Sequence, residues 1–289
     1  MGCRPVEMEV FMETEPIDLA VVIVSYNVSA LLKRCLETVL ASEGDVRFRV
    51  VVVDNDSPDD SVAMVEEHFP EVAIIANKEN VGYPAANNQG LRLLGVESER
   101  PPRYSLLLNP DTEVPPNCFA DFVRYMDDNQ DVGVLGPKLV LPTGELDWAC
   151  RRAFPSPEVS IYRMVGLSRL FPQSPRFGRY NMTFLDVDEL AEVDSVVGAF
   201  MMVRTAAIRK VGLLDETFWM YGEDLDWAKR IKDAGWKVVY NPAVTVLHVK
   251  RASSRQNPRA QIEFYRAMPI FYYKHYRQGT PLLLHWLIL

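Results

Sequence analysis

Two groups of acidic residues have the types and spacing that chemistry on a charged substrate requires. In the stretch LLLNPDTEVPP, an apolar run ends in Asn109, a proline and the single carboxylate of Asp111. In the stretch YGEDLDW, Glu223, Asp224 and Asp226 crowd the first turn of a predicted helix. Carboxylates at such positions can hold a divalent cation or accept a proton, and crowded carboxylates repel one another. Ordinary acidity at a helix start is the alternative for the second group.

Each of the first four predicted strands ends in a cluster of polar residues. The strands are the short, apolar, β-branched runs 19–24, 49–53, 72–76 and 104–108. Since the carboxyl ends of parallel strands form one edge of a sheet, we expect the four clusters to converge on one crevice. Turn formation is the alternative for any single cluster, because Asn, Asp and Gly are common in turns. The candidate residues are Ser25, Tyr26, Asn27, Asp54, Asp56, Asn80, Gly82, Asn87, Asn109 and Asp111.

The predicted crevice lacks the two common phosphate-binding fingerprints. No G-x-G-x-x-G follows the first strand, and the chain contains no G-x-x-x-x-G-K-[ST]. The loops instead offer neutral and acidic groups that suit a nucleobase edge and a ribose. Asp54 can accept a hydrogen bond from a pyrimidine N–H, and the turn at Gly82 lets the backbone approach a phosphate.

The order of the predicted elements indicates how these residues are positioned. Strands alternating with helices up to Leu141 predict an α/β fold with a mostly parallel sheet covered on both faces. Ser57 is expected to cap a helix that starts at Pro58. Beyond Leu141 the pattern loosens, until a strand over 195–203 and a helix over 223–234, closed by Gly235, restore it.

The chain is expected to have three parts. The first is a mobile N-terminal tail and the last is a basic, aromatic, helical C-terminal extension. Between them lies a main domain in two halves, of which the first contains the four polar strand ends and the second contains the acidic turn. The expected ranges are 1–17 for the tail, 18–250 for the main domain, with halves 18–141 and 142–250, and 251–289 for the extension.

Composition and termini restrict the partners and the location. A net charge of −8 argues against nucleic acid, because phosphate binding favours a basic surface. The four cysteines form no C-x-x-C pair and no zinc spacing, and the N-terminus has no signal-peptide pattern. The terminal run PLLLHWLIL is shorter than the roughly 20 residues that span a bilayer. Since it follows FYYKHYR, it is an interfacial anchor, a packed final helix or the start of a longer segment.

The motifs SYN, VVVDNDSPDDS, NVGYPAANNQG, LLLNPDTEV and YGEDLDW, in this order, resemble family 2 glycosyltransferases with the GT-A fold. The similarity extends over residues 19–248, and the nearest branch is that of the rhamnosyltransferase-like members. The resemblance implies a GT-A fold with a Rossmann-like half, an acceptor half and a helical C-terminal extension. It also implies inverting transfer from a nucleotide-diphosphate sugar, with Mg²⁺ or Mn²⁺ on the diphosphate.

Matching motif to motif, the resemblance assigns roles to particular residues. Asp224 is expected to be the general base, with Glu223 as the next candidate. Asp111 and His248 are expected to hold the metal, although His248 could equally be an ordinary strand-end histidine. The family's metal motif is usually D-x-D, and Asn109 stands here at its first position. We interpret this as a variation in which Asp111 carries the metal binding.

A run of basic residues follows His248, with a single acid, Glu263, among them. Lys250, Arg251 and Arg255 are expected to contact the donor diphosphate. The later members could meet an anionic membrane or a lipid pyrophosphate, and a solvated helix face is the alternative. The other histidines are expected at the surface or on a membrane side. The later basic residues are Arg259, Arg266, Lys274 and Arg277, and the other histidines are His68, His275 and His285.

The predicted function is transfer of a sugar, with L-rhamnose from dTDP-rhamnose as the expected case, to a saccharide or polyprenyl-linked acceptor in cell-surface polysaccharide synthesis. The expected location is the cytoplasm, with peripheral contact at the inner face of the membrane. Specificity is expected to lie in 151–190 and 219–221. The alternatives are a non-catalytic module that binds nucleotide-sugar or lipid carrier, and a sugar-nucleotide pyrophosphorylase. The loop SYNVSALLKR disfavours the pyrophosphorylase, because it lacks the Gly-rich basic sequence of such enzymes.

Overall fold

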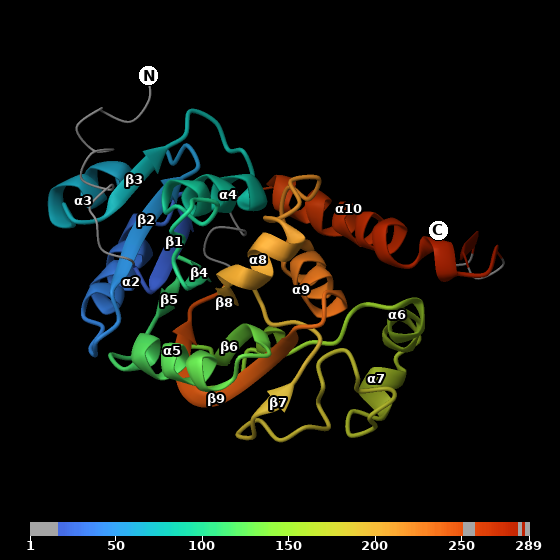
Figure 1. The fold of residues 1–289 in the computed structure, drawn as a ribbon. Helices are drawn as coiled ribbons and strands as arrows, with labels where there is room; N and C mark the ends of the chain where they lie inside the picture. Colours follow the sequence, from blue (N-terminus) through green and yellow to red (C-terminus); the bar gives the residue numbers. More distant parts are fainter. Residues whose placement is uncertain (1–16, 251–257, 283–284, 287–289) are drawn as a thin grey trace.

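A computed structural model describes residues 17–250, 258–282 and 285–286 (Figure 1). One mixed sheet forms its centre, with strands in the order β3-β2-β1-β4-β8-β6-β9-β5 and β7 paired to β9 at the side. The expected mobile tail over 1–17 falls almost wholly outside the described residues. The strands are β1 (Leu19–Ser25), β2 (Phe48–Asp54), β3 (Ala73–Ala76), β4 (Tyr104–Leu108), β5 (Thr112–Glu113), β6 (Val132–Val140), β7 (Ala191–Glu192), β8 (Phe200–Arg204) and β9 (Lys237–His248).

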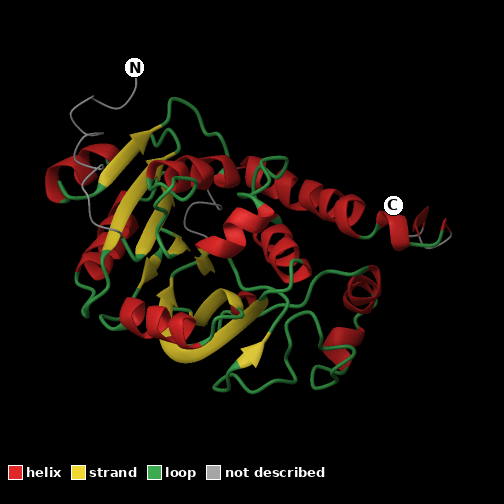
Figure 2. Ribbon diagram, in the orientation of Figure 1, coloured by secondary structure: helices red, strands yellow, loops and turns green. Residues whose placement is uncertain are grey.

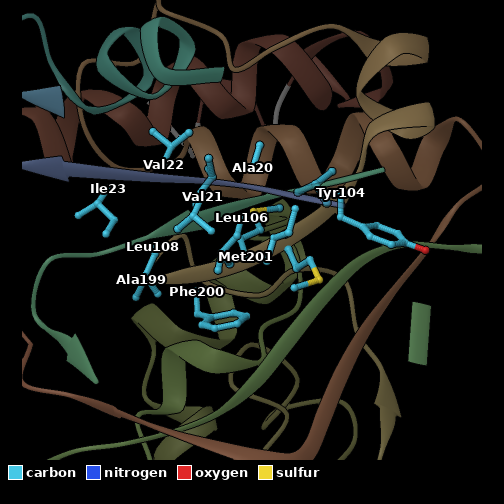
Figure 3. Close-up of a cluster of buried hydrophobic side chains, with 14 of the residues drawn as sticks. Ala20, Val21, Val22, Ile23, Tyr104, Leu106, Leu108, Ala199, Phe200 and Met201 are labelled. Atoms are coloured by element: carbon cyan, nitrogen blue, oxygen red, sulfur yellow. The ribbon is translucent and has the colours of Figure 1, made fainter. Parts of the chain in front are cut away.

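The first four strands along the chain form a parallel half-sheet. β3, β2, β1 and β4 run side by side in one direction, with Ile23 opposite both Val52 and Leu108. The central strands β1 and β4 are buried on both faces, which explains their unbroken apolar sequences. Figure 3 shows the side chains of β1 and β4 packed with Phe200 and Met201 of the next strand in the sheet. The parallel order brings the polar carboxyl ends of these strands to one edge, as predicted.

The second half of the sheet is mixed, and it brings the chain back to the same edge. β8 pairs antiparallel with β4 and β6, whereas β9 runs parallel to β6. The register between β6 and β9 shifts at Pro137/Lys138, and β9 bends around the sheet (Figure 1). As a result, the end of β9 reaches β5, where His248 lies opposite Thr112. The pairing of β5 with β9 therefore places His248 beside the loop that carries Asp111.

Helices cover both faces of the sheet (Figure 2). The last long helix, α10, packs on α9 and the loop before it through an apolar cluster of Phe218, Leu225, Ala267 and Phe271. No described helix is long and apolar enough to cross a membrane. The α-helices are α2 (Ser29–Leu40), α3 (Ser61–His68), α4 (Tyr83–Leu93), α5 (Cys118–Asp128), α6 (Pro157–Met164), α7 (Leu167–Leu170), α8 (Thr205–Val211), α9 (Glu223–Asp233) and α10 (Pro258–His275), and the 3₁₀ turns are η1 (Trp148–Cys150) and η3 (Arg277–Gly279).

Two expected element boundaries were wrong, and both affect the site. The helix expected from Pro58 begins at Ser61, because Ser57 uses its hydroxyl and amide groups on Asp54 instead of capping a helix. The strand expected over 195–203 begins only at Phe200. The preceding residues form a loop whose Gly198 N–H points at Asp224. The end of α9 agrees with the prediction, since Gly235 follows it with φ +94°.

Candidate active site

Asp111 and His248 form the first part of the site. Pairing of β5 with β9 brings them together although they lie far apart in the sequence. His248 Nε2 lies 3.5 Å from Asp111 Oδ1, and both side chains are buried. The backbone supports the contact, because Val249 N donates a hydrogen bond to Asp111 O. The two residues therefore present an imidazole nitrogen and a carboxylate oxygen to the same point.

Asp147 orients His248 and was not found from the sequence. Its Oδ2 lies 2.9 Å from His248 Nδ1, and its Oδ1 accepts hydrogen bonds from Lys250 Nζ and from Ala149 N at the start of η1. Burial alone would favour the neutral forms of His248 and Asp147, but the hydrogen bonds between charged groups have the larger effect. Hydrogen bonds with Asp111 and Asp147 raise the pKa of His248 to about 9, against the lowering effect of burial. Burial raises the pKa of Asp147, yet its bonds from His248 and Lys250 hold that pKa well below the ordinary range.

This arrangement fits a divalent cation with few protein ligands. Adjacent ligands of an octahedral ion with bonds of about 2.1 Å stand about 3 Å apart, close to the Asp111–His248 separation. A carboxylate on the second ring nitrogen, as Asp147 provides, is the usual support of a metal-binding histidine. Within the described part of the chain, no three His, Cys, Asp or Glu side chains gather in a way that could hold a metal ion. An ion at this point would therefore need oxygen atoms of a substrate or water.

Asp224 forms the second part of the site, in the first turn of α9. Its Oδ2 accepts hydrogen bonds from Arg152 Nη2 at 2.6 Å and from Gly198 N at 3.1 Å. Its Oδ1 accepts from the amide of Leu225. Left-handed backbone at Gly222, with φ +84°, turns the chain sharply into the helix. Three donors from three segments thus fix the orientation of the carboxylate.

Glu223 and Asp226 occupy quite different environments on the same turn. Glu223 is buried, and its Oε2 has no hydrogen-bond partner among the described residues. Burial, followed by repulsion from Asp224, raises the pKa of Glu223 to about 8, so it is protonated at neutral pH. Asp226 points away from the site and binds Arg230 and the end of α10. The acidic turn therefore holds a neutral acid, a fixed carboxylate and a structural ion pair.

Tyr83, at the start of α4, joins the two parts of the site. Its hydroxyl donates to Gly198 O at 2.9 Å and lies 3.2 Å from Asn109 Oδ1. Gly198 in turn donates its amide to Asp224. Burial first, then the nearby Glu223 and Asp224, raises the pKa of Tyr83 well above its ordinary value, so the phenol stays protonated. No pattern in the sequence indicated Tyr83 or Arg152, beyond their place in or near polar motifs.

The predicted nucleotide loops meet at the same edge but differ in exposure. Asp54 is buried beneath Ser57, whose hydroxyl and amide both donate to it, and the Ser57 hydroxyl also accepts from Asn27 N. Burial raises the pKa of Asp54, and the bonds from Ser57 oppose that rise. Asp56 is exposed and adopts φ +67°. The structure thus presents the rim of this loop to solvent and keeps Asp54 underneath.

The turn at Gly82 is held by Asn80 on its own loop and packs closely against the loop that carries Trp219. Asn80 Oδ1 accepts from Gly82 N, and a Cβ added at Gly82 would lie 2.5 Å from Trp219 O. Of the other predicted contacts, Tyr26 is partly exposed, whereas Ser25 and Asn87 are fully buried. The side chains of Ser25 and Asn87 therefore lie beneath the crevice surface.

The basic residues after β9 are only partly described. Lys250 is paired with Asp147, as above, whereas the predicted contacts Arg251 and Arg255 lie outside the described residues. A cavity of about 910 Å³ between α2 and α3 shares Asn27 with the predicted site but contains none of the catalytic candidates. The expectation of surface positions failed for two histidines. His275 binds Asp226 with its side chain 9% exposed, and His285 is buried beside Tyr272.

Comparison with known proteins decides the family. Residues 20–212 match the family model described as "Glycosyl transferase family 2". The chain belongs to this family. A relative from Mycobacterium tuberculosis, N-acetylglucosaminyl-diphospho-decaprenol L-rhamnosyltransferase, is 28% identical over 250 residues, covering 84% of this chain and 80% of the relative. Rhamnosyltransferase WbbL of Escherichia coli is 24% identical over 244 residues, covering 81% and 84%.

A solved structure supports the fold of this family 2 glycosyltransferase. GalNAc-T7 with UDP, GalNAc and Mn²⁺ superposes with a TM-score of 0.62 at 15% sequence identity. The match covers 90% of this chain and 50% of GalNAc-T7, so the chain spans half the length of that protein. The predicted GT-A fold is therefore confirmed. The enzyme is a glycosyltransferase with an α/β core and a mostly parallel sheet.

Proposed function

We propose that this glycosyltransferase moves L-rhamnose from dTDP-L-rhamnose, with inversion and with a divalent metal, to a saccharide or lipid-linked saccharide acceptor. The observation that carries the proposal is that the loop with Asn109 and Asp111, which brings Asp111 beside His248, also contacts Tyr83, and Tyr83 leads through Gly198 to Asp224 at one sheet edge. The two relatives named above support rhamnose as the sugar. The Mn²⁺ in the structure of GalNAc-T7 supports a metal.

Asp111 and His248 would hold Mg²⁺ or Mn²⁺, and Asp147 would fix the imidazole. When bound there, such a cation would offset the negative charge that grows on the nucleotide diphosphate as the glycosidic bond breaks. Asn109, at the first position of the usual D-x-D motif, has its Oδ1 3.2 Å from the Tyr83 hydroxyl. It therefore keeps the hydrogen-bonding shape of aspartate without adding a second charge. Lys250, which pairs with Asp147, stands at the same end of the site for contact with the diphosphate.

Asp224 would act as the general base. It takes the proton from the acceptor hydroxyl as that oxygen attacks the anomeric carbon from the face opposite the leaving group. Arg152, Gly198 and Leu225 hold the carboxylate for this transfer. Glu223, neutral at physiological pH, is suited to donate a hydrogen bond to a substrate hydroxyl rather than to accept its proton. The structure thus favours Asp224 over Glu223 for the role.

The nucleotide is proposed to lie along the ends of β1, β2 and β4. The rim residues Tyr26, Asn27 and Asp56 would face the base and ribose, while the backbone at Asn80 and Gly82 approaches the phosphates. A lipid-linked acceptor would enter from the side of α10, which packs on the loop before α9. Peripheral membrane contact through the C-terminal extension would keep the enzyme near such acceptors, and cell-surface polysaccharide synthesis is the proposed setting.

The test is a screen of dTDP-, UDP- and GDP-sugars by thermal shift with and without Mn²⁺, because a bound ligand raises apparent stability. Stabilisation by dTDP-rhamnose that needs the metal is the expected result. Donor hydrolysis and transfer to a polyprenyl-diphosphate saccharide then follow on the same samples. Binding without hydrolysis or transfer would instead support a non-catalytic binding module. Stabilisation only by another sugar nucleotide would refute rhamnose while leaving the transferase assignment intact.

A further inference from the structure

Exposed large hydrophobic side chains gather in two segments of this enzyme. Among the described residues, all but Trp148 and Leu190 belong either to the α6–α7 region or to α10 and the residues after it. The part of the molecule that carries the proposed nucleotide-binding edge contributes none of these exposed side chains. Scattered exposed hydrophobics are ordinary, but a concentration of this kind marks an interaction surface. The exposed members are Met164, Val165, Leu170 and Phe171 in the first segment and Ile262, Phe264, Tyr265, Met268, Tyr273, Leu282 and Trp286 in the second.

The first segment has a definite shape, which we call the α6–α7 tip (Met164–Phe171). Gly166, with φ +79°, turns the chain between the two short helices. Met164 and Leu170 are 75% and 70% exposed on either side of this turn. Beneath the tip, Phe177 packs edge-on against Tyr162 and with tilted rings against Phe171. The apolar side chains are therefore held outward by a packed base, and their exposure does not result from a lack of structure.

The charge around the tip is opposite in sign to that of the whole protein. Residues 157–180 contain four arginines and one acid, Glu158, in a chain whose net charge is −8. Arg163 lies over the Tyr180 ring, and Arg176 lies over Tyr162 while it pairs with Glu158. A surface that combines exposed apolar residues with arginine suits the interface of a bilayer rich in anionic lipid.

The end of α10 adjoins the base of the tip, as Figure 1 also shows. A cavity of about 320 Å³ is lined by Ser156 and Glu158 on one side and by Tyr276 and Pro281 on the other. Beyond it, Trp286 is 72% exposed. Tryptophan is favoured at membrane–water interfaces. The tip and the chain after α10 thus flank the same part of the molecule.

We propose that the α6–α7 tip is a membrane-docking element, which inserts Met164, Val165 and Leu170 into the interfacial region of an anionic bilayer. The inference goes beyond the proposed C-terminal contact, and it does not depend on which sugar is transferred. A second copy of the chain is a poorer occupant, because a two-fold interface would bring the same arginines face to face. An anionic membrane neutralises them.

Vesicle co-sedimentation tests the proposal on the full chain without any substrate. Vesicles of phosphatidylcholine with phosphatidylglycerol should bind the wild type, and vesicles of phosphatidylcholine alone should bind it less. Met164→Glu and Leu170→Glu should each weaken binding about tenfold, because each removes one inserted apolar side chain and adds a negative charge. Leu190→Glu is the matched control, since it adds the same charge at an exposed leucine outside both segments. It should bind like the wild type.

Leu170→Trp gives a second arm that does not depend on loss of folding, and it should strengthen binding. Unchanged binding in both glutamate variants, or an equal loss in Leu190→Glu, would overturn the proposal. Light scattering without vesicles tests whether a second copy of the chain covers the tip instead. A wild-type dimer that Met164→Glu converts to a monomer would mean that the tip is a contact between copies. Donor hydrolysis by the wild type is measured separately, without vesicles. If the wild type did not hydrolyse the donor, this would count against the proposed function, and the vesicle result could still be interpreted.

Discussion

Arg152 Nη2 lies 2.6 Å from Asp224 Oδ2, and both side chains are nearly buried. The pair joins the segment after η1 to the first turn of α9, which are 72 residues apart. A buried carboxylate with this partner cannot change rotamer without leaving an arginine unpaired. The contact thus fixes the orientation of the carboxylate that we propose as the general base. In that role, the acceptor oxygen would have to compete with a guanidinium for the same carboxylate.

Asp224→Asn should lower transfer by about 10²- to 10⁴-fold, the range that a positioned general base contributes. The amide keeps the size of the side chain but cannot take up the proton. Donor binding should survive, because Asp224 is not among the proposed nucleotide contacts. Turnover on saturating donor and calorimetric donor affinity measure the two effects separately. Near-normal turnover would rule out Asp224 as the base.

Glu223→Gln is the contrasting variant and should keep most of the transfer activity. Glutamine resembles the protonated glutamic acid that burial and Asp224 impose at this position. Because the pKa of Glu223 rises from 4.5 to about 8 on folding, the folded state binds more protons than the unfolded state between these values. Stability should therefore fall as pH rises across that window and level off above it.

The measurement is the denaturant midpoint of wild type and Glu223→Gln from pH 5 upward. The variant should show a flatter profile through the window, and the two curves should differ most at its alkaline end. Parallel curves would mean that Glu223 titrates normally. Loss of transfer in Glu223→Gln with retention in Asp224→Asn would exchange the two proposed roles.

Asp147→Asn should weaken metal-dependent donor binding by about 10- to 100-fold, as removal of a carboxylate behind a metal-binding histidine does. Asp111→Asn should abolish the metal dependence, because the proposed ligand itself is lost. Donor titration by calorimetry with and without Mn²⁺ checks both. Asp188→Asn is a suitable control, since Asp188 is an exposed carboxylate that pairs with Lys138 away from the site. Equal affinities in all three variants would remove the metal from this position.

The parts of the site that could be predicted are those encoded next to one another. The apolar runs with polar ends were enough to predict the parallel half-sheet and the edge that carries Asn109 and Asp111. The motif order also led to Asp224. These are local patterns, in which strand length, β-branching and the following turn agree.

The parts that could not be predicted depend on long-range packing. Asp147 follows an ordinary turn and acquires its role only because β9 bends to bring His248 beside it. Arg152 and Tyr83 reach the site from separate segments, and no periodicity marks them. Ser57 has the sequence of a helix cap, yet its hydroxyl donates a hydrogen bond to Asp54 instead. Tertiary contacts decide the partners of these side chains, and a local sequence pattern does not contain those contacts.

Asp226 provides the last prediction, because it ties α10 to α9, the helix that carries Asp224. It is fully buried, and its oxygens meet Arg230 at 2.9 Å, Lys274 at 2.8 Å and His275 at 2.7 Å. Burial raises the pKa of Asp226, but the bonds from His275, Lys274 and Arg230 outweigh this and lower it to about 2. The folded-state pKa is depressed below 3.8, so the stabilisation is present above that value and is lost as pH falls toward about 2.

Asp226→Asn should therefore destabilise the fold by about 3 kcal/mol, since it removes the buried carboxylate charge that meets Arg230, Lys274 and His275, although Lys274 keeps its pair with Asp215. Opening should begin with α10, whose protease sensitivity and hydrogen exchange should rise before the sheet unfolds. Asp233→Asn is the control, because it breaks only the partly exposed Lys229–Asp233 pair and should cost under about 1 kcal/mol. If the two variants were equally stable, the ion pair would not hold α10. If Asp226→Asn instead loosened α10 and also slowed transfer, the docked helix would help to position the Asp224 turn, two residues away on the same helix.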